Sequence, residues 1–196
     1  MKQKARTGTN HLYHVSMEFV DEFIPRIPDT RLIDENSYTP RICCAPTIEQ
    51  GVEASPGILS GIKLAMEIGF SPILHVYELF APEESIYRPT EEDVPDADRS
   101  DEVWILEEPS DWELRSYNVA DMKSYKQGDG YEVCEYLELV PCENRMDNYD
   151  AFCAFLGVDE SAADTLRSEY RFRSILNLIN ADEGKWKEFF LQIRNR

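Results

Sequence analysis

The change of residue pattern at Pro141 is the feature that most limits which fold this chain can adopt. Before Pro141, short apolar runs alternate with proline-rich and acidic loops, a pattern typical of strands with a few short helices. From about residue 145 to the end, apolar residues recur every three or four positions, which is the spacing of amphipathic helices. The sequence therefore predicts an α+β fold with a helical C-terminal unit.

We divide the 196 residues into three parts on this basis. Residues 1–10 form a flexible basic tail, residues 11–142 an α+β domain, and residues 143–196 a helical subdomain. The chain has no secretory signal and no apolar run near the roughly 20 residues that a membrane span needs. The expectation is a cytoplasmic protein with no membrane partner.

Strands and helices within the α+β domain follow from local patterns. Strands are predicted at residues 11–16, 41–46, 71–80, 102–106 and 112–119, and at residues 131–140, where a helix is the rival prediction. Thr47 and Gln50 have the spacing of a capping box at the start of a short helix over residues 48–55. A second helix runs from Ile58 to Gly69.

The net charge of -18 excludes tight binding to a nucleic-acid backbone, which requires lysine and arginine. The charge is uneven, because the segment from Glu78 to Glu113 holds 14 acidic and 2 basic residues. Such a run is either a solvated loop or a negative surface for a basic partner. One reading is therefore a non-catalytic acidic protein that inhibits a partner by blocking its basic, nucleic-acid-binding surface.

Several common site motifs are missing from the sequence. There is no glycine-rich phosphate loop, no GxSxG, no HExxH and no CxxC. His11 and His14 are three apart on one predicted strand, so their side chains point to opposite faces. We therefore predict no metal site.

Three segments in chain order suggest a different chemistry. They are LYHVS at residues 12–16, RICCAPTIEQGVEA at residues 41–54, and DEVWILEEPSDWELRSYNV at residues 101–119. Together they resemble the ADP-ribosyltransferase superfamily, which includes the poly(ADP-ribose) polymerase catalytic domain. In that family a first-strand histidine, a strand followed by a helix, and a glutamate opening a later strand form the site. The resemblance implies split antiparallel sheets with short helices.

The resemblance also implies NAD as co-substrate and gives roles to three residues. His14 would bind a ribose hydroxyl of NAD, and the backbone of Val15 would meet the nicotinamide carboxamide. Glu102 would bind the nicotinamide ribose and stabilise the positive charge that develops when the glycosidic bond breaks. On this reading Glu102 and His14 are the catalytic residues, and they should face one cleft.

Charge and position indicate the remaining cofactor-binding residues. Arg26, Arg31 and Arg41 flank the long loop between the first two segments, and a guanidinium binds pyrophosphate oxygens well. Thr47 stands near the place where the best-known family members carry a tyrosine that stacks on nicotinamide. The expected activity is NAD-dependent mono-ADP-ribosylation of a macromolecular acceptor, most simply a protein, or hydrolysis of NAD.

Overall fold

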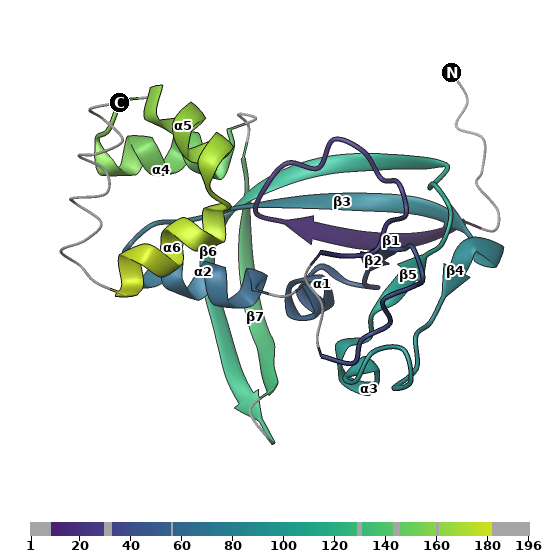
Figure 1. The fold of residues 1–196 in the computed structure, drawn as a ribbon. Helices are drawn as coiled ribbons and strands as arrows, with labels where there is room; N and C mark the ends of the chain where they lie inside the picture. Colours follow the sequence, from purple (N-terminus) through teal and green to yellow (C-terminus); the bar gives the residue numbers. More distant parts are fainter. Residues whose placement is uncertain are drawn as a thin grey trace.

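The computed structural model describes residues 9–29, 33–55, 57–128, 131–142, 146–159 and 161–181. Within them the chain forms two antiparallel sheets, with helices packed against the first (Figure 1). This is the α+β class that the change of pattern at Pro141 predicts. The predicted tail is represented only by Thr9 and Asn10, which belong to the first strand.

The first sheet has four strands in the order β1-β3-β6-β7. These strands are β1 (Thr9–Ser16), β3 (Ile73–Pro82), β6 (Asp111–Gln127) and β7 (Tyr131–Pro141). β6 and β7 form a long hairpin whose tip projects away from the rest of the sheet (Figure 1). The rival prediction of a helix over residues 131–140 is wrong, because this segment pairs with β6 along its length.

The second sheet has the order β2-β5-β4 and is built from very short strands. They are β2 (Ile42–Cys44), β5 (Val103–Ile105) and β4 (Ile86–Tyr87). β2 also touches β1 through an isolated bridge between Tyr13 and Ala45. The strands predicted on either side of residues 107–111 do not pair with each other as a hairpin. β5 pairs with β2, whereas β6 pairs with β3 in the other sheet.

The two helices whose limits were predicted, α1 and α2, begin and end close to them. The described helices are α1 (Ile48–Ala54), α2 (Ile58–Glu67), η1 (Glu83–Ser85), α3 (Ala97–Ser100), α4 (Asn148–Leu156), α5 (Ser161–Glu169) and α6 (Phe172–Ala181). The Thr47 hydroxyl accepts the backbone N–H of Gln50, which confirms the predicted cap. Gly69 adopts a φ of 79°, a left-handed conformation that favours glycine after a helix.

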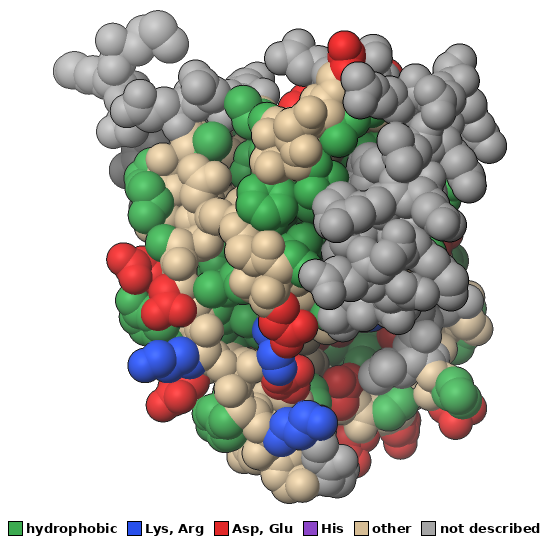
Figure 2. All heavy atoms as spheres, turned by 90° about the vertical axis from the view of Figure 1, so that its left-hand side faces the viewer, with side chains coloured by type: hydrophobic (Ala, Val, Ile, Leu, Met, Phe, Trp, Pro, Cys, Tyr) green, Lys and Arg blue, Asp and Glu red, His purple; other side chains and the backbone are tan. Residues whose placement is uncertain are grey.

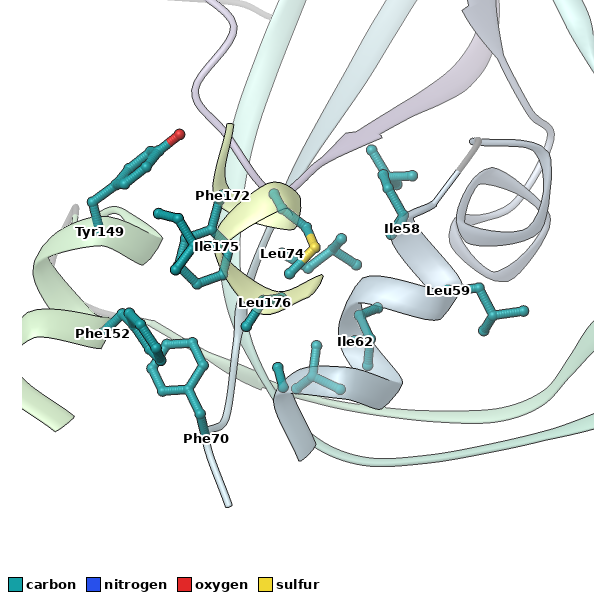
Figure 3. Close-up of a cluster of buried hydrophobic side chains, with 14 of the residues drawn as sticks. Ile58, Leu59, Ile62, Phe70, Leu74, Tyr149, Phe152, Phe172, Ile175 and Leu176 are labelled. Atoms are coloured by element: carbon teal, nitrogen blue, oxygen red, sulfur yellow. The ribbon is translucent and has the colours of Figure 1, made fainter. Parts of the chain in front are cut away.

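The larger hydrophobic core lies between one face of the first sheet and the helices α2, α4, α5 and α6 (Figure 3). Ile62 of α2, Phe152 of α4 and Phe172 of α6 are fully buried in it. Asn148 fastens α4 to the sheet, because its amide donates to the carbonyl oxygens of Met17 and Ile73 and accepts the N–H of Ile73, each at 2.7 Å. The C-terminal helices therefore share one core with the sheet.

The smaller core lies on the other face of β1 and β3. There Leu12 and Leu79 meet the inward residues of the second sheet, such as Val103. Residues 17–25, which we call the strap, cross this face in front of β1 and β3 (Figure 1). Phe23 of the strap is buried in the smaller core. The long loop predicted after the first strand thus serves in part as a cover for the sheet.

Hydrophobic side chains also reach the surface on the side that carries α4, α5 and α6 (Figure 2). Phe155 and Leu178 are each nearly half exposed there. No helix in the described parts of the chain combines the length and the apolar character needed to cross a membrane.

Candidate functional site

The three segments that suggested a site lie on adjacent strands, although the third is about ninety residues from the first. β2 is hydrogen-bonded to β5 on one side and touches β1 on the other, through the Tyr13–Ala45 bridge. His14, Cys43 and Glu102 therefore belong to neighbouring backbones. The prediction from sequence that these segments come together agrees with this arrangement.

β1 and β2 separate immediately after their bridge. The backbones of Tyr13 and Ala45 exchange two hydrogen bonds, of 2.8 and 2.9 Å, and the ladder then stops. Four residues before Ala45, Arg41 at the start of β2 forms a second isolated bridge, with Arg26. Cys43 thus lies on this edge of β2 between two bridges. We call the gap between Cys43 and β1 the fork.

His14 reaches the fork from the β1 side. Its Nδ1 atom lies 2.9 Å from the carbonyl oxygen of Cys43. A carbonyl oxygen only accepts, so Nδ1 carries the proton. Burial lowers the pKa of His14, which outweighs the opposing effect of this hydrogen bond. His14 is therefore neutral near pH 7, and its Nε2 atom is a hydrogen-bond acceptor that suits a ribose hydroxyl.

The backbone of Val15 points into the same gap. Tyr13 uses its N–H and C=O toward β2, so the alternation of an antiparallel strand directs those of Val15 away from β3 as well. The ladder with β2 ends before it reaches Val15. A planar amide placed there can both donate to and accept from this backbone.

Glu102 sits at the entry to β5. The residue before it, Asp101, has a left-handed φ of 47°, and its carboxylate accepts the side-chain amide of Gln50 in α1 at 2.6 Å. One oxygen of Glu102 accepts the indole N–H of Trp104 at 2.7 Å, and the carboxylate also accepts the thiol of Cys43. Burial raises the pKa of Glu102 above its usual range despite these two hydrogen bonds.

The expectation that His14 and Glu102 face one cleft is wrong. The Tyr13–Ala45 bridge puts the side chains of Tyr13 and Ala45 on one face of the sheet, so the side chain of His14 points to the opposite face. There the imidazole ring meets Phe23 and Tyr77. The pairing of Cys43 with Trp104 puts Glu102, two residues earlier, on the Tyr13 face. The two residues are linked instead through Cys43, whose carbonyl meets His14 and whose thiol meets Glu102.

The side chain of Arg41 forms its contacts inside the protein. It is fully buried and forms an ion pair with Glu35. Its guanidinium also donates to the carbonyl oxygens of Asn36 and Thr39, at 3.0 and 3.1 Å. Arg41 therefore fixes the loop of residues 35–39 onto the second sheet, and it has no exposed face for the pyrophosphate that the sequence assigned to it.

The other predicted cofactor residues are dispersed. Arg26 is exposed beside the fork, and its positive charge contributes to the lowered pKa of His14. Thr47 is exposed, and its hydroxyl is engaged with Gln50 as the helix cap. Arg31 lies outside the described residues. Of the two predicted arginines that the structure describes, Arg26 is the one whose charge acts on His14.

Three residues of the site were not identified from the sequence, namely Cys43, Trp104 and Phe23. No sequence motif marks Cys43, and the functional role was predicted for Arg41, two residues before it. The two-residue spacing of Glu102 and Trp104 on a strand was a usable signal, because it places both side chains on one face. Nothing in the sequence of the strap marks Phe23 as the partner of a histidine.

Among the described residues, no group of histidine, cysteine and carboxylate side chains could hold a metal ion. No protein-family model, curated protein sequence or solved structure matches the chain.

Proposed function

We propose that this protein binds NAD at the fork and at Glu102, and transfers ADP-ribose to a macromolecular acceptor, or to water when no acceptor is bound. The fold proposed with this activity is a divergent form of the ADP-ribosyltransferase architecture with its split antiparallel sheets. The observation that carries the proposal is the position of Cys43, which contacts both His14 and Glu102.

The fork has the chemical groups that a nicotinamide riboside requires. An amide can pair with the backbone of Val15, and a ribose hydroxyl can donate to Nε2 of the neutral His14. Because His14 and Glu102 point to opposite faces, the riboside must lie along the edge of β2 rather than over a face. Arg41 takes no part in binding, and of the two predicted arginines in the described parts of the chain we assign the phosphate oxygens to the exposed Arg26.

The reaction breaks the bond between the anomeric carbon and the nicotinamide nitrogen. The bonding electrons leave with nicotinamide, which departs as a neutral ring, so no strong general acid is needed. The anomeric carbon becomes cationic until an oxygen or nitrogen of the acceptor bonds to it and releases a proton. A carboxylate held in place at Glu102 stabilises that cation more than it stabilises the substrate.

The test is the release of nicotinamide from NAD by the wild type and by Glu102→Ala and Glu102→Gln variants. We expect both variants to lose at least about a hundredfold in rate, as when a preorganised transition-state stabiliser is removed. Glu107→Ala is the matched control, because Glu107 is an exposed carboxylate just beyond β5. Equal rates for the wild type and Glu102→Ala, or no release by the wild type, would contradict the proposal.

A second candidate function is supported by the charge distribution. Among the described side chains between Glu78 and Glu113, nine carboxylates are exposed, at positions 83, 84, 91, 92, 101, 107, 108, 111 and 113. Such a surface suits an acidic protein that covers the basic surface of a partner. The salt dependence separates the two functions, because binding through exposed charges weakens steeply with ionic strength and NAD binding weakens only mildly.

A further inference from the structure

Trp104 lies two residues after Glu102 on β5, and both side chains point to the same face. Trp104 is fully buried. Its indole N–H donates to Oε1 of Glu102 across 2.7 Å. An indole has a single donor and no acceptor, so this hydrogen bond uses its entire polar capacity.

The indole is itself held by its surroundings. The guanidinium carbon of Arg41 lies 4.0 Å from the centre of the Trp104 ring, a cation–π contact. The ring of Tyr87 packs nearby, at 5.5 Å between centroids. Because Arg41 is fastened by Glu35 and by two carbonyl oxygens, the ring it covers cannot rotate freely.

We propose that Trp104 is the positioning residue of this site, holding one oxygen of Glu102 so that the other faces the ribose of the substrate. This inference rests on the proposed function. It gives the buried Arg41 a role as well, because Arg41 acts through Trp104 instead of binding phosphate. Trp104 itself touches no substrate.

Loss of the indole N–H has two consequences for Glu102. Its carboxylate would keep only the thiol of Cys43, which is a weak donor, and would sample more orientations. The hydrogen bond from Trp104 also favours the ionised form of Glu102 and so lowers its pKa against the effect of burial. Without that bond the pKa of Glu102 should rise further.

The kinetic test is a Trp104→Phe variant, which keeps an aromatic ring and removes the N–H. We expect kcat for nicotinamide release to fall about tenfold or more, with KM for NAD unchanged within twofold. The acid limb of the kcat profile should move to higher pH, which a purely structural role would not cause. Tyr87→Phe is the control, because it keeps the ring beside Trp104 and removes only a hydroxyl that donates to Asp93.

A second measurement uses the folded wild type without substrate. The indole N–H resonance of Trp104 should shift with pH as Glu102 ionises, and the shift should be absent in Glu102→Gln. The other two tryptophan indoles are internal controls. This measurement can overturn the inference even if Trp104→Phe fails to fold.

The outcomes separate this inference from the proposed function. If Glu102→Ala loses activity while Trp104→Phe keeps the wild-type rate and pH profile, the role of Trp104 is overturned and the proposed function is not. The role of Trp104 is also overturned if its indole resonance does not shift as Glu102 ionises. If the wild type releases no nicotinamide but its indole resonance shifts as Glu102 ionises, the proposed function is overturned. The hydrogen bond between Trp104 and Glu102 is then still supported.

Discussion

Phe23 lies edge-on against His14, with 5.4 Å between the ring centroids and 75° between the ring planes. The strap therefore places an aromatic side chain directly on a histidine of the fork. Phe23 also meets Tyr77 and Trp112 on the same face of the first sheet. The backbone N–H of Val20 donates to the hydroxyl of Tyr77 at 2.7 Å and fastens the strap a second time.

Removal of this ring should change the titration of His14. In Phe23→Ala the burial that lowers the pKa of His14 is reduced, so we expect its pKa to rise toward 6.5. The free energy of unfolding should fall by about 3 kcal/mol, as for a large buried ring. An NMR titration of the imidazole protons and urea denaturation measure the two effects. Ile24→Ala is the control, because Ile24 is adjacent in the strap and more than half exposed.

His75 should make the stability of the protein depend on pH. Burial lowers its pKa to about 4, although the charge of Asp147 opposes the shift. In the unfolded chain His75 binds a proton below pH 6.5, whereas in the folded protein it binds one only below about pH 4. The folded protein therefore loses stability as the pH falls from 6.5 to about 4. The loss should be about 2 kcal/mol between pH 7 and pH 5.

The corresponding variant is His75→Gln, which cannot titrate and can still hydrogen-bond to the hydroxyl of Ser116. Urea denaturation at pH 7 and pH 5 should show a smaller decrease for this variant than for the wild type. The same decrease in both proteins would show that other groups cause the pH dependence.

Asn148 should be the least replaceable polar residue at the junction of sheet and helices. Asn148→Ala removes three hydrogen bonds and leaves the carbonyl oxygens of Met17 and Ile73 without this partner. We expect the free energy of unfolding to fall by about 3 kcal/mol or more. Asn177→Ala, at an exposed position of α6, should change it by less than about 0.5 kcal/mol. Similar effects of the two substitutions would contradict this assignment.

Local signals in the sequence predicted most of the elements. The Thr47–Gln50 cap and the Gly69 turn depend on residues a few positions apart, and both are found in the structure. The strand at residues 131–140 was predicted with a helix as the rival, and its pairing with β6 decides for the strand. The cap and the turn depend little on the rest of the chain, which is why they are readable from sequence.

Pairing between distant strands was harder to predict. β5 and β6 are consecutive in sequence, yet they join different sheets because each finds its apolar partner elsewhere. The register at the Tyr13–Ala45 bridge decides which face His14 and Glu102 occupy, and a shift of one residue would reverse it. The ion pair between Arg41 and Glu35 depends on a loop conformation that no periodicity signals.

The larger core also determines when this protein can fold during its synthesis. Its buried residues run from Val15 in β1 to Leu176 in α6, so they span most of the chain. A ribosome that has released only the sheet and α2 has produced an apolar surface whose other covering helices, α4, α5 and α6, do not yet exist. We therefore expect the nascent chain to acquire its stable structure only late in translation, and to need protection from aggregation until then.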